Sequence, residues 1–278
     1  MVGYMTSDGS APATINRGLS SLRGYCSWAT IHGLMPEDPA IGIEDVPTDP
    51  PAPRSLPDEA VDALMRAAHQ VPDPILRARD EALLAILVYV GLRAQEACDL
   101  QLRDLDLAGG TLTVRRGKGG KPRCVPLHLD AQHLLQRYMT AVRCPDGSPP
   151  LGDEAERAPL LSGRQITIPG QPVQPGITTR LIRQRVQALG RQAAVRLREG
   201  AERTSNLRRA EELRALARQL DAATPHMLRH SLARRLLRSG AHLPEVQRVL
   251  GHSRLSTTGM YLTPNEEDLR FAIGRAGL

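Results

Sequence analysis

Hydrophobic residues recur every three or four positions through most of this chain, and this spacing predicts a mainly helical protein. A first helix is predicted to end at Gly33 and to bury the stripe Ile15, Leu19, Leu22, Cys26 and Ala29. A second helix follows residue 57, with the stripe Val61, Leu64, Met65 and Ala68. Residues 82–90 are apolar on nearly every side, which indicates a helix in the centre of a domain that stops at Gly91.

One stretch departs from the helical pattern and predicts a β-hairpin. Residues 111–114 (TLTV) alternate as a strand does, and residues 123–127 (RCVPL) can return beside them. The turn between them, GKGGK, combines glycines that allow a tight reversal with lysines that reach outward. The expected fold is therefore mainly α with a small β-hairpin or sheet.

Proline marks the expected domain boundary. Residues 46–57 (VPTDPPAPRSLP) contain five prolines, which keep a segment extended. We therefore expect a short helical N-terminal segment over residues 1–50 and a main domain over residues 51–278. Within the main domain, residues 143–176 are predicted to form a loop, and a basic helix covers 178–197. Residues 199–223 are predicted to add an inserted amphipathic helix with the stripe Leu207, Ala210, Leu213, Ala217 and Leu220.

The most informative stretch begins at Thr224. This residue can cap a helix whose first turn contains Pro225 and whose exit is Ser239-Gly240. His226 and Arg229 are three positions apart and share a face of its first turn, where free backbone N–H groups and the positive dipole end favour an anion such as phosphate. A second helix starts near Pro244 and ends at Gly251, with Val246, Val249 and Leu250 on one side. His252 follows directly, and Tyr261 stands nine residues later.

Each of these residues has an ordinary interpretation when taken alone. A single histidine is more often a surface or satisfied core residue, Tyr261 could be a half-buried tyrosine, and Arg229 could be a solvated helix residue. The order and spacing of H-x-x-R, then L-G-H-S, then the tyrosine make the combination specific.

The amino-acid composition limits the classes of binding partner and the cellular location that are expected. The 278 residues have a net charge of +6 and a pI near 9.5, which favours a polyanionic partner without choosing between nucleic acid, an acidic protein and a membrane surface. Aromatic residues make up only 3%, which argues against a single-strand binder built on base stacking. The four cysteines lack metal-ligand spacing, no signal peptide is evident, and the longest apolar run is too short to span a bilayer. A cytoplasmic protein without membrane contact is expected.

The motifs resemble those of the tyrosine recombinase (phage integrase) family. The family's His-x-Leu-Arg-His box is matched by residues 226–230 (HMLRH), its Leu-Gly-His box by residues 250–252, and its nucleophile by Tyr261 in GMYLTP. Upstream, Gly91-Leu92-Arg93-x-x-Glu96 matches the first arginine box, and residues 117–123 match the family's lysine turn, G-K-G-x-K-x-R. The resemblance thus covers roughly residues 55–265.

The resemblance implies a site, a reaction and partners. The implied catalytic residues are Arg93, Lys118, His226, Arg229, His252 and Tyr261, with Glu96 in support and no metal or other cofactor. The implied reaction is site-specific cleavage and rejoining of DNA through a covalent 3′-phosphotyrosine. Contacts with double-stranded DNA are expected from Lys121, Arg123, Arg180 and Arg183. Family members also self-associate, as a dimer on DNA and a tetramer in the synapse. A C-terminal helix, here 265–278, links protomers in the family.

The resemblance implies a shortened helical core-binding segment in residues 1–50 and the catalytic domain in residues 51–278. The alternative interpretation of the first segment is a helical cap on the main domain. The sequence leaves two alternative functions open. One is a type IB topoisomerase, whose site is built similarly; the Leu-Gly-His box and the lack of long basic extensions favour the recombinase. The other is a DNA-binding member of the family without strand-exchange activity.

Overall fold

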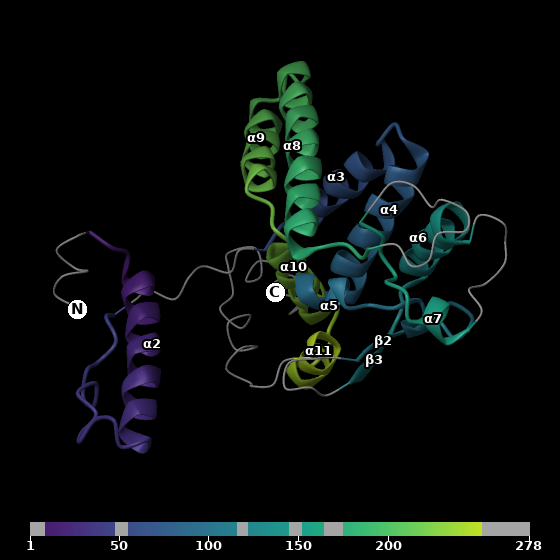
Figure 1. The fold of residues 1–278 in the computed structure, drawn as a ribbon. Helices are drawn as coiled ribbons and strands as arrows, with labels where there is room; N and C mark the ends of the chain where they lie inside the picture. Colours follow the sequence, from purple (N-terminus) through teal and green to yellow (C-terminus); the bar gives the residue numbers. More distant parts are fainter. Residues whose placement is uncertain (1–8, 48–54, 116–121, 145–151, 164–174, 252–278) are drawn as a thin grey trace. The chain divides into compact units, whose positions relative to one another are not determined.

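The computed structural model describes residues 9–47, 55–115, 122–144, 152–163 and 175–251 (Figure 1). The chain divides into two compact units, Met1–Ala52 and Pro53–Leu278. The division falls inside the proline-rich stretch that the sequence marks as a boundary. The predicted C-terminal helix over 265–278 lies outside the described residues.

The first unit consists of one long helix and the segment that returns along it. Helix α2 spans Pro12–Ile31 and buries four of the five residues predicted to be its stripe, while Leu22 is half-buried. The side chain of Asn16 fixes the returning segment, because its amide bonds both the N–H and the carbonyl of Val46 at 2.8 Å. Whether this unit serves as a core-binding segment remains a prediction.

The centre of the second unit is the apolar helix that the sequence predicts. Helix α4 (Pro74–Ala85) is capped by Asp73 and continues as a π-helical turn, Ile86–Val90, that stops at Gly91 with φ of 68°. Helices α3 (Asp58–His69) and α6 (Leu129–Tyr138) pack against α4, and α6 runs on as a second π-helical turn, Met139–Arg143. Helix α6 was not anticipated in the sequence.

A small antiparallel sheet follows the core helix. Helix α5 (Ala94–Cys98) and a 3₁₀ turn (Leu102–Asp104) lead into the strands β1 (Leu105–Asp106), β2 (Thr111–Val114) and β3 (Arg123–Pro126), in the order β1-β2-β3. The register pairs Leu112 with Val125, and both are buried. The predicted hairpin is thus present, with β1 as an added strand. The described part of the stretch predicted as a loop includes the short helix α7 (Asp153–Glu156).

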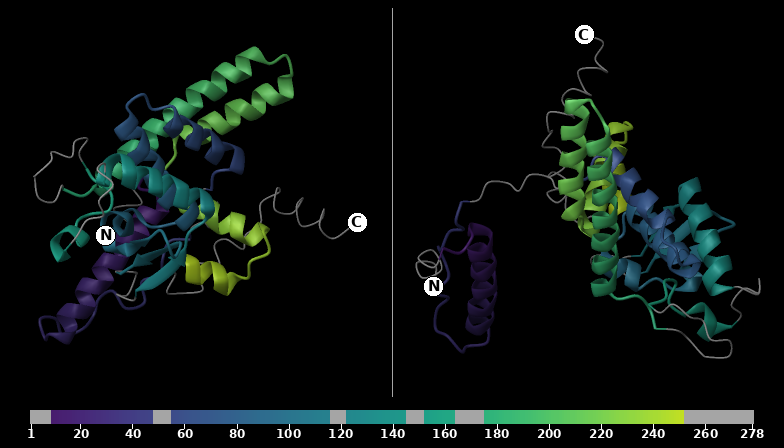
Figure 2. Two further views of the ribbon diagram at one scale, coloured as in Figure 1. Left: turned by 90° about the vertical axis from the view of Figure 1, so that its right-hand side faces the viewer. Right: turned by 90° about the horizontal axis from the view of Figure 1, so that it is seen from above.

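Helices α8 (Thr179–Arg203) and α9 (Leu207–Asp221) form a long antiparallel hairpin (Figures 1 and 2). They approach closely at Gly190, where a Cβ would lie 2.4 Å from the carbonyl oxygen of Leu220. Two details differ from the sequence-based expectation. Residues 199–203 continue α8 instead of starting the inserted helix, and Leu207 is 82% exposed. Leu207 follows the capping residue at the turn of the hairpin and contributes nothing to the buried stripe.

The last two described helices are α10 (Pro225–Arg238) and α11 (Leu243–Leu250). The hydroxyl of Thr224 accepts from the N–H of Met227 at 3.4 Å, and α11 stops at Gly251 with φ of 65°, as the sequence predicts. Helix α10 packs on the π-helical turn before Gly91 and on α11. This packing brings the segment after Gly91, the first turn of α10 and the end of α11 together. Within the described residues, no helix combines the length and apolar character needed to span a membrane.

Candidate active site

A pocket of about 490 Å³ collects three of the predicted catalytic residues. Arg93 comes from the segment after Gly91, while His226 and Arg229 come from the first turns of α10. The N-terminal half of α8 also lines the pocket. The remaining lining residues are Leu92, Ala94, Gln95, Thr179, Arg183, Gln187, Thr224 and Pro225. Three arginines, Arg93, Arg183 and Arg229, and a helix N-terminus therefore line one cavity, which suits a phosphate.

Arg229 is the largest fully buried side chain of the described chain, with 1% exposure. Its guanidinium donates to the backbone carbonyls of Gly91 and Leu250 and lies 3.8 Å from the carboxylate of Glu96. These contacts hold a permanent cation at the wall of the pocket in a fixed orientation. A buried cation needs such partners, because an unpaired charge in the interior is strongly unfavourable.

Glu96 anchors the arginine cluster. Its carboxylate accepts from the backbone N–H of Arg93 at 2.9 Å and from Nη1 of Arg93 at 2.8 Å. It also accepts from both terminal nitrogens of Arg123. Burial by itself would raise the pKa of Glu96, but the hydrogen bonds from Arg123 and Arg93 and their positive charges bring that pKa below its ordinary value of 4.5. Glu96 is therefore an anion at neutral pH, and its supporting role in the site stays a prediction.

Arg123 lies elsewhere than the sequence led us to expect. The resemblance implies a contact with the DNA backbone, whereas the structure turns this side chain inward onto Glu96, with 12% of the side chain exposed. Arg123 and Glu96 are 27 positions apart, so no local sequence pattern indicates this contact. The DNA contact of Arg123 stays an untested prediction, and its observed contacts favour a role inside the protein.

Two histidines stand edge to face in the first turns of α10. The rings of His226 and His230 have centroids 4.6 Å apart. Burial, followed by the charges of Arg229 and Arg93, lowers the pKa of His226 below its ordinary value of 6.5, so this ring is neutral at pH 7 and can accept a proton. Burial, together with the neighbouring His226 and Arg229, lowers the pKa of His230 to about 4. The sequence shows His230 one helical turn after His226 but gave no reason to assign it a role.

We expect His230 to make the stability of the second unit depend on pH. Because the pKa of His230 is about 4 in the folded chain and 6.5 in its ordinary state, the unfolded chain binds more protons between these values. Stability is therefore full above pH 6.5 and falls as the pH drops toward 4, by about 2 kcal/mol at pH 5 from this residue. Denaturant unfolding of wild type and His230→Gln at pH 7.5 and pH 5 measures the difference. Equal losses in the two proteins would contradict the prediction.

The predicted DNA contacts of α8 lie beside the pocket. Arg183 lines the cavity together with Thr179 and Gln187, and Arg180 is exposed in the first turn of the same helix. Lys118, Lys121, His252 and Tyr261 lie outside the described residues. In the sequence, His252 directly follows Gly251, and Lys118 stands between the residues of β2 and those of β3. No group of three His, Cys, Asp or Glu side chains in the described parts of the chain is placed to hold a metal ion.

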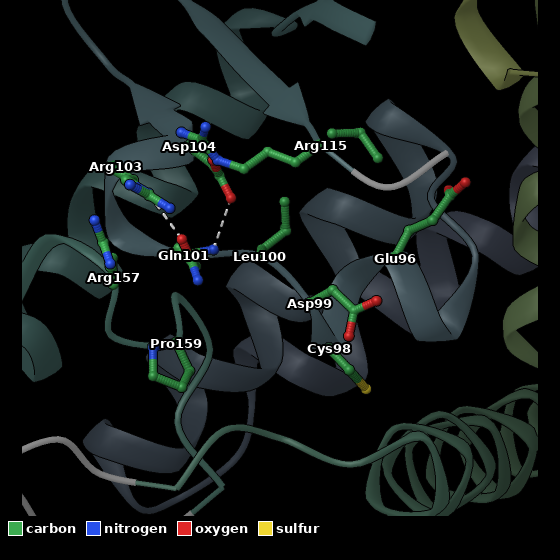
Figure 3. A pocket seen from close by; sticks show the side chains of 11 residues that line it. Glu96, Cys98, Asp99, Leu100, Gln101, Arg103, Asp104, Arg115, Arg157 and Pro159 are labelled. Atoms are coloured by element: carbon green, nitrogen blue, oxygen red, sulfur yellow. Dashed lines mark hydrogen bonds and ion pairs between the residues drawn. The ribbon is translucent and has the colours of Figure 1, made fainter. Parts of the chain in front are cut away.

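A second pocket of about 310 Å³ lies between α5, the sheet and the segment after α7 (Figure 3). Its arginines are engaged locally. Arg103 donates to the side chain of Gln101 at 2.8 Å, Arg115 pairs with Asp104, and Arg157 pairs with Asp153 at 2.6 Å. None of the predicted catalytic residues lines this pocket, although the supporting residue Glu96 stands at its edge. Each of its three arginines thus already has a side-chain partner, and we assign this pocket no chemistry.

The fold is that of a known class of protein. A model of the phage integrase family matches residues 54–268, and the chain belongs to that family. Among its relatives is tyrosine recombinase XerC of Rhodospirillum centenum, which is 33% identical over 264 residues, 94% of this chain and 65% of the relative. Tyrosine recombinase XerD of Pseudomonas aeruginosa is 34% identical over 245 residues, 88% of this chain and 69% of the relative. The chain thus spans about two thirds of the length of these curated relatives.

Solved structures show the same fold at lower identity. The XerH site-specific recombinase bound to palindromic difH substrate, in a post-cleavage complex, has a TM-score of 0.65 at 22% identity. The match covers 96% of this chain and 68% of that one. The Tn1549 transposon integrase in complex with transposon right end DNA has a TM-score of 0.62 at 19% identity, covering 100% and 83%. These comparisons confirm the resemblance to the tyrosine recombinase family and the mainly helical fold with a small sheet.

Proposed function

We propose that this protein is a site-specific DNA recombinase that cleaves and rejoins DNA through a covalent bond between Tyr261 and a 3′ phosphate. The observation that carries the proposal is the pocket in which Arg93, His226 and Arg229 meet, beside the end of α11 that leads directly to His252. Relatives named tyrosine recombinases, and solved relatives bound to DNA, support it.

The residues of the pocket suit nucleophilic substitution at a phosphodiester. Arg93 and Arg229 can hold the two non-bridging oxygens and stabilise the charge that develops on them in the transition state. His226, neutral because its pKa is lowered, can take the proton of Tyr261 as the tyrosine oxygen attacks phosphorus.

The remaining predicted residues complete the step. The bond to the 5′ oxygen breaks, and that oxygen receives a proton from Lys118 as the general acid. His252 donates a hydrogen bond to the phosphate. The phosphotyrosine keeps the energy of the broken bond, so a 5′ hydroxyl of another strand can reverse the step and rejoin the DNA. This chemistry needs neither a metal nor a nucleotide.

The partner is double-stranded DNA in the cytoplasm. Exchange of strands needs more than one active site, and we propose a dimer on DNA and a tetramer in the synapse. Residues 1–50 would serve as a shortened core-binding segment, and Lys121, Arg180 and Arg183 would contact the DNA backbone.

Covalent capture tests the proposed function. Wild type and Tyr261→Phe are incubated with fragmented genomic DNA of the source organism and then denatured, and the attached DNA is sequenced. Wild type should retain DNA with a shared sequence at the junction, whereas Tyr261→Phe should retain none. Binding of DNA by both proteins without any attachment would instead support a DNA-binding protein. Attachment with relaxation of any supercoiled plasmid would support a topoisomerase.

We expect Arg183→Ala to weaken DNA binding in a salt-dependent way. Arg183 lines the pocket from α8 and is exposed, so it can neutralise one phosphate. Losing one phosphate contact should lower the slope of log affinity against log salt by about 1. Binding titrations between low and moderate salt measure this slope. Arg214→Ala removes an exposed arginine of α9 that lines neither pocket and should leave the slope unchanged; equal slopes for wild type and Arg183→Ala would contradict the prediction.

A further inference from the structure

Arg123 is bound on two sides within the protein. Its Nη1 and Nη2 reach the two oxygens of the Glu96 carboxylate at 3.1 and 2.9 Å, which is the paired geometry that a guanidinium forms best. Its Nε donates to the carbonyl of Val249, near the end of α11, at 3.3 Å. One side chain at the start of β3 therefore joins the hairpin, α5 and α11.

The end of α11 is held by arginines at three successive carbonyls. Arg123 bonds the carbonyl of Val249, Arg229 bonds that of Leu250, and Arg93 bonds that of Gly251 at 3.4 Å. The last carbonyls of a helix lack intrahelical partners and lie at the negative end of its dipole, so cations stabilise them. The same three arginines surround Glu96, with the closest N–O separations between 2.8 and 3.8 Å.

Gly251 makes room for this arrangement. Its φ of 65° lies in the left-handed region, and a Cβ at this position would come within 2.7 Å of Nη1 and 3.0 Å of Nε of Arg123. Glycine is therefore needed twice, once for the backbone turn and once for the approach of the guanidinium. The close packing against Gly251 shows that the Arg123 side chain lies inside the protein, against the end of α11.

The three arginines differ in what they face. Arg93 and Arg229 line the 490 Å³ pocket, whereas Arg123 does not. A phosphate in the pocket would compete with Gly251 and Leu250 for the N–H groups of Arg93 and Arg229. Arg123 does not line the pocket, so a phosphate bound there would not compete for its bonds to Glu96 and Val249.

We propose that Arg123 is a positioning residue of the DNA cleavage site, which fastens β3 and the end of α11 to Glu96. By chain connection, it thereby fixes the two segments that lead to Lys118 and His252, while Arg93 and Arg229 bind the phosphate. This inference rests on the proposed recombinase function. In it, Arg123 does not touch DNA but holds in place the segments that carry other residues of the site.

Cleavage kinetics test the proposal with the full chain and the DNA fragment recovered by covalent capture. At saturating DNA, Arg123→Ala should cleave about 10 to 100 times more slowly, since a misplaced general acid costs about this much. Its Kd for DNA and the salt dependence of binding should match wild type. Arg123→Lys should recover only part of the rate, because one ammonium group cannot span both carboxylate oxygens and the Val249 carbonyl. Arg103→Ala, at an exposed arginine of the neighbouring 3₁₀ turn, is the control and should cleave at the wild-type rate.

A stability measurement keeps the inference separate from the recombinase function. Arg123→Ala, Glu96→Gln and the double variant are unfolded in denaturant, and the loss in the double variant should be smaller than the sum of the two single losses. This energetic coupling between Arg123 and Glu96 is expected even if wild type does not cleave DNA. That result would contradict the proposed function but not the anchoring of Arg123 to Glu96. If Arg123→Ala does not fold, Arg123→Lys supplies both measurements.

Two results would overturn the proposal. One is additive stability losses for Arg123 and Glu96. The other is an Arg123→Ala protein that cleaves as fast as wild type at saturating DNA but binds DNA more weakly with a lower salt slope, which would make Arg123 a DNA contact.

Discussion

Arg229→Lys should slow DNA cleavage by about 10² to 10³ while leaving DNA affinity within a few-fold of wild type. Arg229 is buried to 1% exposure at the wall of the pocket, where its two terminal nitrogens are oriented by the carbonyls of Gly91 and Leu250. Lysine keeps the charge but presents a single flexible ammonium, which cannot satisfy both carbonyls and also bind a phosphate oxygen. The contact that is lost grows stronger as charge develops on the phosphate, so the effect falls on the cleavage rate.

Single-turnover cleavage of the captured DNA target, at saturating protein, measures this effect. Arg235→Lys is the matched control, since Arg235 lies on the same helix but is more exposed and pairs with Asp58 at 3.0 Å. The control should cleave within about twofold of wild type, in keeping with the small energies of exposed ion pairs. Cleavage by Arg229→Lys at a rate close to that of the control would show that Arg229 has no part in the transition state.

Glu96→Ala is expected to destabilise the second unit by about 3–5 kcal/mol. The carboxylate is 5% exposed and pairs with Arg93 and Arg123, with Arg229 close by. Its removal leaves a cluster of guanidinium groups in the interior without the anion that offsets their charge. Glu96→Gln keeps the shape of the side chain and should lose most of the same free energy.

Denaturant unfolding at pH 7 and at acid pH checks the prediction for Glu96. Because the pKa of Glu96 is below its ordinary value of 4.5, its stabilising contribution is present above that value and is lost as the pH falls through the folded pKa. The gap between wild type and Glu96→Gln should therefore narrow in acid. Glu212→Ala, which removes an exposed partner of Arg208, should cost less than about 1 kcal/mol. A loss for Glu96→Gln as small as that of Glu212→Ala would contradict the anchoring role.

The local elements could be predicted because their signals lie close together in the sequence. Thr224 and Pro225 specify the start of α10, Gly251 specifies the end of α11, and the alternation of residues 111–114 specifies β2. The meeting of Arg93 with Arg229 is different, since no local pattern joins the two. Only the family resemblance implied that meeting, and the structure brings both residues into one pocket.

Other side chains take positions that depend on tertiary contacts, which the sequence pattern does not reveal. The side chain of Arg123 points into the protein because it hydrogen-bonds Glu96 and the carbonyl of Val249. Neither residue is near Arg123 in the sequence. Asp80 stands in a charged stretch yet is fully buried, because Arg185 of α8 and Arg79 pair with it. Leu207 is apolar yet exposed, because it lies at the turn of a helical hairpin. In each case tertiary contacts, and not local preference, decide the position.

The central claim, covalent catalysis by Tyr261, is tested most directly by locating the attached nucleotide. The adduct from wild type is digested with nuclease and protease, and peptides carrying a nucleotide remnant are identified by mass spectrometry. The chain has five tyrosines, so the assignment discriminates among real alternatives. The account predicts a phosphodiester on the peptide that contains Tyr261 and on no other. A remnant on another residue, or DNA cleavage without any linked peptide, would contradict it.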